Sequence, residues 1–160
     1  MKDRPMFTTL VDFFNLLLAA LLVGIIFSTW LTANPAGLGA SDFIVVQQQH
    51  IRALNLFMPL LGGATILITL VSAFLARADG TRLTMLVVVA LSFVIAGLVT
   101  RFLNQPINAI VMTWTPAAPP ADWMQLRDVW WRWHLVRLAF GLLGLCLLIV
   151  AMLRRAVIGG

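Results

Sequence analysis

Charged residues are scarce in this sequence. They make up only 11% of its 160 residues, whereas soluble proteins carry about 25%. Hydrophobic residues reach 61%, and a soluble domain of this size has too little interior to bury so much apolar surface. The composition therefore excludes a soluble globular protein, a disordered chain and a small secreted scaffold, and it indicates a membrane protein.

Several residue types that common chemistries need are also scarce or missing. Cys146 is the single cysteine, which excludes an internal disulfide and a cysteine-rich metal site. The sequence has no glutamate, and Asp42, Asp122 and Asp128 lie in segments expected to be loops. A hydrolytic triad or a carboxylate-held metal is therefore not expected, and no glycine-rich phosphate loop is present.

The formal net charge of +5 would in another setting suggest a nucleic-acid partner. Here the cations stand at the ends of apolar runs, a placement typical of anchoring at a membrane surface. We therefore expect the lipid bilayer, and no nucleic acid, as the partner of this surface charge.

Four intervals without charged residues define the expected spans, since a helix needs about 20 apolar residues to cross the hydrocarbon layer. Backbone amides in lipid must find partners within their own helix, so we expect an all-α transmembrane four-helix bundle. It forms one integral membrane domain over residues 1–160. The first apolar stretch is longer than an ordinary secretory signal, which favours a retained helix. The spans are predicted at about 7–32, 53–76, 83–104 and 132–153.

The distribution of cations bears on orientation, because four spans place both termini on one side. The side of the termini would hold six cations and the other side five. Cations tend to stay in the cytoplasm, so the sequence predicts, by this narrow margin, a bacterial inner-membrane protein with both termini cytoplasmic. The six are Lys2, Arg4, Arg77, Arg82, Arg154 and Arg155, and the five are Arg52, Arg101, Arg127, Arg132 and Arg137.

Polar and ionisable residues gather at the end of the spans away from the termini. Such residues are energetically costly at membrane depth, so their presence there indicates a structural or functional role. Within the third and fourth spans they recur at helical spacing, on one face of each helix. Pro106 falls inside the third group and predicts a kink or an unwound turn. The pattern predicts a pocket built from three spans: His50, Arg52 and Asn55, then Arg101, Asn104 and Asn108, then Trp130, His134 and Arg137.

The sequence leaves a structural interpretation open for these residues. Arg52 and Arg101 could extend to lipid headgroups, and the asparagines could join neighbouring helices. The tryptophans, among them Trp114, Trp130 and Trp133, could form an interfacial belt. Small residues are expected to allow close helix packing at Gly62, Gly63, Ala64, Ala90, Gly97, Gly141 and Gly144. At the opposite end, Asp12 and Asn15 are expected to pair with Arg77 or Arg82.

Three stretches carry a resemblance to a known family. They are Arg101-Phe-Leu-Asn104-Gln-Pro106-Ile-Asn108, then Trp114, then Trp130-x-x-Trp133-His134-x-x-Arg137. Together they resemble the anthrone oxygenase-like family of small four-helix membrane proteins, and span count and loop lengths agree over nearly the whole chain. The resemblance implies that O₂ oxidises an anthrone to an anthraquinone without an evident cofactor.

The pocket residues suit a flat aromatic or anionic molecule, because indoles stack on rings and Arg and Asn donate hydrogen bonds to an oxyanion. Under the resemblance His134, or second His50, would take a benzylic proton, and the electron-rich product would react with O₂. A lipophilic substrate would enter from the outer leaflet. Arg101 and Arg137 would stabilise the enolate oxygen, Asn104 and Asn108 would hold ketone or phenol oxygens, Trp130 and Trp133 would clamp the rings, and Arg52, Asn55 and Trp114 would complete the binding site.

Other functions remain open at this stage. His50 and His134 could ligate a b-type haem axially, with Arg on its propionates, or they could hold copper together with Met112 or Met124. Either would make a redox or quinone-reactive protein. The chain could also be a non-catalytic small-molecule-binding subunit, and its small-residue faces permit a homo-oligomer.

Overall fold

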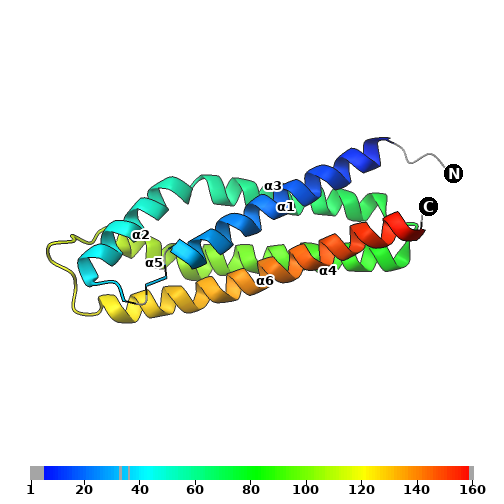
Figure 1. The fold of residues 1–160 in the computed structure, drawn as a ribbon. Helices are drawn as coiled ribbons and strands as arrows, with labels where there is room; N and C mark the ends of the chain where they lie inside the picture. Colours follow the sequence, from blue (N-terminus) through cyan, green and yellow to red (C-terminus); the bar gives the residue numbers. More distant parts are fainter. Residues whose placement is uncertain (1–5, 33, 36, 159–160) are drawn as a thin grey trace.

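The computed structural model describes residues 6–32, 34–35 and 37–158, and within these ranges the chain is mostly helical and contains no strand (Figure 1). Four long helices form an antiparallel bundle, which confirms the all-α four-helix architecture. Shorter helical segments lie between them at one end. In chain order the elements are α1 Met6–Thr32, α2 Ala40–Leu54, α3 Phe57–Leu75, α4 Gly80–Val99, η1 Thr100–Asn104, α5 Gln105–Val111 and α6 Trp123–Ile158.

Four helical segments are long and apolar enough to cross a membrane: Met6–Thr32, Phe57–Leu75, Gly80–Val111 and Trp123–Arg154. The predicted boundaries were close for the first span but too narrow for the third and fourth. Residues 123–131 mix tryptophans with charged residues. A prediction based on charge-free apolar intervals therefore missed the first turns of α6. Lys2 and Arg4, on which the orientation partly depends, lie outside the described residues.

The segment expected as a connection before the second span is itself mostly a helix, α2. The second span, predicted to start at about residue 53, starts at Phe57 instead. The helix is interrupted at Asn55–Leu56 and continues as α3. Pro59 explains the break, since it has no N–H for the carbonyl of Asn55 and is tolerated only in the first turn of a helix. His50 and Arg52 therefore belong to a separate helix, which runs obliquely to α3 at one end of the bundle (Figure 1).

The kink expected near Pro106 is present as a short π-helix, η1, between α4 and α5. The amide of Gln105 donates to the carbonyl of Thr100, five residues earlier, instead of four. A π-bulge of this kind accommodates one extra residue in the turn before a proline and is frequent at functional sites. It shifts the register of every residue that follows.

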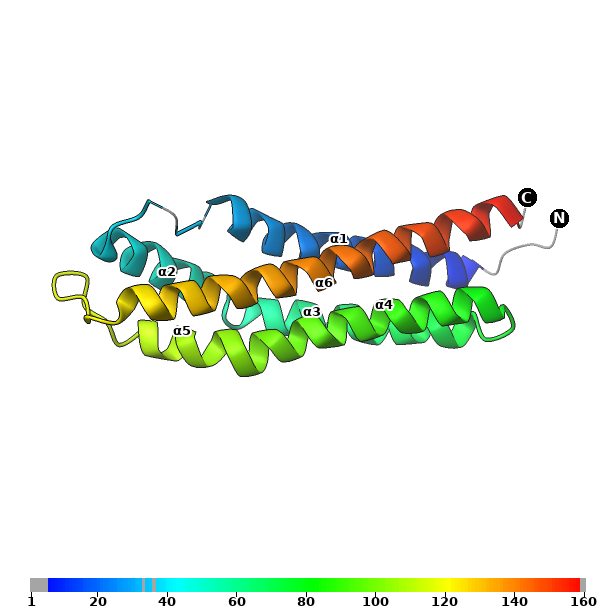
Figure 2. The ribbon, with the colours of Figure 1, turned by 90° about the horizontal axis from the view of Figure 1, so that it is seen from below.

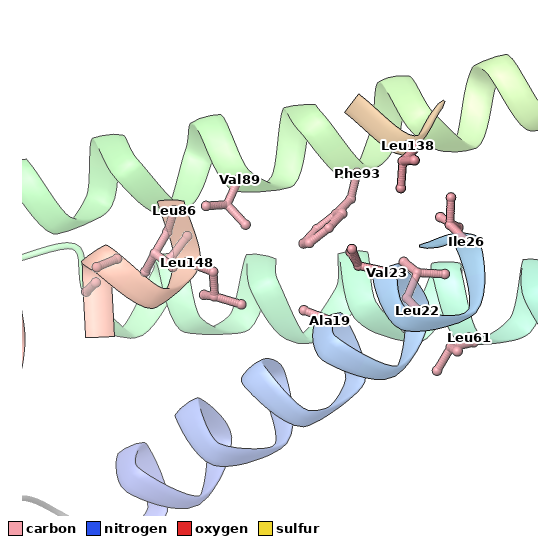
Figure 3. Close-up of a cluster of buried hydrophobic side chains, with 13 residues drawn as sticks. Ala19, Leu22, Val23, Ile26, Leu61, Leu86, Val89, Phe93, Leu138 and Leu148 are labelled. Carbon is pink, nitrogen blue, oxygen red and sulfur yellow. The ribbon is translucent and has the colours of Figure 1, made fainter. Parts of the chain in front are cut away.

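Figures 1 and 2 place α2, α5 and the start of α6 at one end of the bundle, and the start of α1 and the end of α6 at the other. Between these ends lies an apolar core with contributions from all four long helices (Figure 3). Val23 of α1, Phe93 of α4 and Leu138 of α6 meet there. The polar residues of interest lie beyond this core, at the end away from the termini.

A polar contact set joins the helices at the end of the termini. Asp12 forms the expected ion pair with Arg82, whose Nη2 lies 2.7 Å from Oδ1. The expectation for Asn15 was wrong, because it faces α3 one turn deeper, where its Nδ2 donates to Ser72 Oγ at 3.1 Å and Thr69 Oγ1 donates to its Oδ1 at 2.8 Å. These buried contacts anchor α1 in the bundle.

Among the glycines of the described residues, Gly144 has the closest neighbour, and this contact yields a stability prediction. A Cβ atom there would lie 2.9 Å from Cε1 of Phe93, whose ring is held by the core cluster. We expect Gly144→Ala to lower the free energy of unfolding by about 1–3 kcal/mol, the usual cost of overpacking. Thermal unfolding in detergent measures the effect.

Gly24→Ala is the matched control, because no heavy atom lies within 4 Å of a Cβ built there. It should leave the free energy of unfolding unchanged or raise it by up to about 1 kcal/mol, because alanine favours a helix over glycine. Equal unfolding temperatures for Gly144→Ala and the control would contradict the close α4–α6 packing.

Candidate functional site

Three cavities adjoin at the polar end of the bundle, and Gln105 lines all of them. We call them the central cavity (about 60 Å³), the apolar cavity (about 270 Å³) and the outer cavity (about 360 Å³). They also share polar residues pairwise, so they form one connected region. Arg137 lines the central and apolar cavities, Arg101 the apolar and outer cavities, and Asn55 and Asn108 the central and outer cavities.

His134 and Arg137 form the most deeply placed pair of the site. His134 is fully buried, and Nη2 of Arg137 lies 2.7 Å from its Nδ1. A guanidinium only donates, so Nδ1 is the acceptor and the proton of the neutral imidazole belongs on Nε2. His134 lines none of the three cavities, whereas Arg137 lines two of them. The histidine thus holds the guanidinium toward the cavities.

Two indoles fix the ring of His134. Trp130 stacks on it with ring centres 5.4 Å apart and an interplanar angle of 8°, and Trp131 with values of 5.2 Å and 19°. Within the described residues Nε2 of His134 and Nε of Arg137 have no hydrogen-bond partner. The stack therefore leaves His134 little freedom beyond its contact with Arg137.

Asn108 is oriented by two donors. Nε1 of Trp130 donates to its Oδ1 at 2.8 Å, and Nε2 of Gln47 donates to the same oxygen at 3.4 Å. Because the side-chain oxygen is occupied, the two N–H groups of Nδ2 are what Asn108 can offer to a ligand oxygen. Asn108 lines the cavities as expected, and it does so as a donor.

Several predicted site residues have structural contacts instead. Fully buried Asn104 donates from Nδ2 to the carbonyl of Trp130 at 3.0 Å, which joins η1 to α6. Arg52 is exposed and donates to Oε1 of Gln48 at 3.3 Å. Trp114 packs on the cluster around Val111. These three residues, together with Trp133 and His134, line none of the three cavities.

His50 is the second histidine, and it lies on the wall of the central cavity. Its Nδ1 is buried and has no hydrogen-bond partner among the described residues. The structure thus separates the two histidines: His50 lines the central cavity and has a buried nitrogen without a hydrogen-bond partner, whereas His134 lines none of the cavities and contacts Arg137. The predicted residues that line the cavities are His50, Asn55, Arg101, Asn108, Trp130 and Arg137.

Two glutamines complete the site and were not predicted. Gln105 stands four residues after Arg101 and three before Asn108, so helical spacing already places it on the face of these two residues, and it lines all three cavities. That spacing was the available signal. Gln47 was hidden because its helix, α2, was expected to be a loop.

Positive charge in the site lacks a carboxylate counterpart. In the described part of the chain the ion pairs are Arg82–Asp12 and Arg127–Asp128, both away from the cavities. Arg101 and Arg137 therefore present uncompensated guanidinium groups to an apolar region, where charge interacts strongly. Such a site favours a ligand that carries or develops an oxygen anion.

The possible ligands of a metal or haem are two histidines and two methionines. Among the described residues no group of three His, Cys, Asp or Glu is placed to hold a metal ion. A haem or copper ion shared by His50 and His134 would have to bind Nε2 of His134, because Arg137 occupies Nδ1. Of the two methionines considered as ligands, Met112 lines the outer cavity and Met124 is exposed.

The contrast between two tryptophans gives a testable prediction. Trp130→Phe keeps a ring beside His134 but removes the donor to Asn108, so we expect the free energy of unfolding to fall by about 0.5–1.5 kcal/mol. Trp133→Phe changes a residue that lines none of the three cavities and should stay within about 0.5 kcal/mol. Thermal unfolding of both variants checks this difference, and the reverse order would contradict the assigned hydrogen bond.

Comparisons with known proteins agree with the sequence resemblance. The protein-family model described as anthrone oxygenase matches residues 49–147, which is more than half of the chain and includes every cavity-lining residue from His50 to Arg137. A search of curated proteins found no match, and a search of solved structures found none. The chain belongs to the anthrone oxygenase family.

Proposed function

We propose that this protein is a membrane oxygenase that oxidises a lipophilic, enolisable aromatic ketone of the anthrone type with O₂. The observation that carries the proposal is the unpaired guanidinium of Arg137, held by His134 and directed at cavities that His50 also lines. An acidic C–H beside a ring ketone needs a base on one side and an anion-stabilising group on the other. His50 and Arg137 supply these two roles.

His50 is the general base in this proposal, in preference to His134. A base needs a free nitrogen lone pair within reach of the substrate. Nδ1 of His134 already accepts from Arg137, and in that tautomer Nε2 carries a proton. His50 has an unengaged Nδ1 and a place on the cavity wall. His134 then acts as a positioning residue for Arg137.

The developing enolate oxygen would be bound by donors that converge on the cavities. Arg137 and Arg101 supply charge, while Asn108 and Gln105 supply neutral N–H groups. Preformed donors in a water-poor site stabilise an oxyanion more than they stabilise the neutral ketone. This difference lowers the barrier to proton removal.

The overall reaction balances without an added reductant. An anthrone loses its benzylic proton to His50, and the resulting anion gives electrons to O₂ and forms a C–O bond at that carbon. The resulting peroxide anion takes up a proton to give a hydroperoxide, which loses water to leave a ketone. One anthrone and one O₂ thus give one anthraquinone and one water. O₂ is the oxidant, and no cofactor is required by this stoichiometry.

We also propose an orientation with both chain ends in the cytoplasm of a bacterial cell and the cavities in the outer leaflet. Arg77, in the turn between α3 and α4, and Arg82, in the first turn of α4, lie at the end of the termini, as the preference of cations for the cytoplasm requires. A reporter active only in the cytoplasm should function when fused after Gly160. Activity of a periplasm-specific reporter at that position would contradict the orientation.

Two substitutions test the assigned chemistry. His50→Ala removes the base, and we expect the anthrone-dependent rate of O₂ uptake to fall by about 10²–10⁴. Arg137→Gln removes the charge that stabilises the enolate and should cost about 10²–10³. Purified protein, 9-anthrone and an oxygen electrode suffice, with anthraquinone measured by absorbance.

Arg52→Gln is the matched control for charge, because Arg52 is exposed and lines none of the three cavities. It should retain wild-type turnover. Full activity of both His50→Ala and Arg137→Gln would contradict the mechanism. A Soret band in the purified protein that is lost in His134→Ala would replace the cofactor-free oxygenase with a haem protein.

A further inference from the structure

The apolar cavity is open toward the lipid between α3 and α4. Gly62 and Gly63 of α3 and Gly97 of α4 line it, and no heavy atom lies within 4 Å of a Cβ built on any of them. Gly63 and Gly97 are also exposed. The expectation that these glycines allow close helix packing was therefore wrong, in contrast to Gly144. They leave space instead of filling it.

The position of this opening determines what can reach it. Gly63 and Gly97 lie within Phe57–Leu75 and Gly80–Val111, the segments long and apolar enough to cross the membrane. An opening at this depth faces hydrocarbon rather than water. A molecule that enters there must already be dissolved in the bilayer.

The walls of the apolar cavity change character along its length. One part is apolar and includes Leu22, Ile66 and the ring of Phe93, while the other part has Arg101, Gln105 and Arg137. The glycine backbone on both sides offers a surface without side chains, which a flat ring system can approach closely. The volume of about 270 Å³ lies near the lower end of about 300–1,000 Å³ for ligand pockets.

We infer that the gap between Gly63 and Gly97 is a lateral portal through which a flat, fused-ring molecule with one ring-borne oxygen enters from the bilayer. The oxygen goes in first, toward Arg137 and Gln105, and the rings remain between the glycine faces. Gly63 and Gly97 are then the residues that determine specificity, since larger side chains there would close the portal to fused rings. The inference rests on the site of the proposed function and extends it to the route by which the substrate enters and to the residues that select it.

A fatty acid, like a fused-ring ketone, has an apolar body with an oxygen group at one end, so it is the alternative occupant of the apolar cavity. The absence of side chains on both glycine faces favours a planar ring over a flexible chain, because a flat body makes contact along its whole length. Competition between the two classes of ligand distinguishes them.

The test measures binding and not turnover. Wild-type protein in lipid nanodiscs is titrated with anthraquinone, a flat tricyclic ketone that has no benzylic proton to lose, and quenching of tryptophan fluorescence reports its Kd. We expect Gly63→Leu and Gly97→Leu each to weaken binding at least tenfold. Gly24→Leu is the matched control, because Gly24 is exposed on α1, lines none of the three cavities and has no heavy atom within 4 Å of its Cβ position; it should bind as wild type does.

Three binding results would overturn the inference. They are unchanged anthraquinone affinity in both portal variants, displacement of anthraquinone by palmitate at equal or lower concentration, and equal loss in Gly24→Leu. His50→Ala separates this test from that of the proposed function, because it should retain anthraquinone binding while losing turnover. If Gly63→Leu and Gly97→Leu turned over anthrone at wild-type rates, the proposed oxygenase function would be retained and the proposed portal would be contradicted.

Discussion

The positive charge of Arg137 inside an apolar helical bundle is the constraint on which the site depends. A guanidinium at such depth is costly unless hydrogen-bond acceptors hold it, and the acceptor here is a neutral histidine, not a carboxylate. The contact orients the side chain without neutralising it. The remaining charge is available to an oxygen anion that forms in the adjoining cavities.

The surrounding architecture serves to maintain this arrangement. Trp130 and Trp131 hold the ring of His134, and Trp130 also orients Asn108. Gln105, which follows the π-helix and precedes Pro106, lies where the three cavities adjoin. At the far end of the bundle, the Asp12–Arg82 ion pair and the contacts of Asn15 secure the helices.

Glycine has two opposite roles in this bundle. Gly144 allows Phe93 to pack directly against α6, so that the core of α4 and α6 is tight. Gly62, Gly63 and Gly97 have no such neighbour and border a cavity. Sequence alone does not distinguish these roles, because a small residue is compatible with a close helix and with an empty space. The distinction depends on which side chains the partner helix presents.

The span count, the bundle and the clustering of polar residues at one end could be predicted from the sequence, because hydropathy and helical spacing are local properties. The irregularity at Pro106 was predictable for the same reason. The helical α2 was not, since its buried face includes Gln47 and Gln48, which apolar periodicity does not register. The relative placement of His50 and His134 depends on where α2 lies at the end of the bundle. This position is set by tertiary contacts, which the local sequence pattern does not reveal.

The central claim is that this site removes a proton from the carbon opposite an aromatic ketone. The most direct measurement is anaerobic hydrogen–deuterium exchange at the benzylic position of 9-anthrone in D₂O, followed by NMR with purified protein. Without O₂ the proton transfer is observed alone. The account predicts exchange well above the protein-free rate with wild-type protein and a return to that background rate in His50→Ala. Background exchange with the wild-type protein, or catalysed exchange that survives His50→Ala, would contradict it.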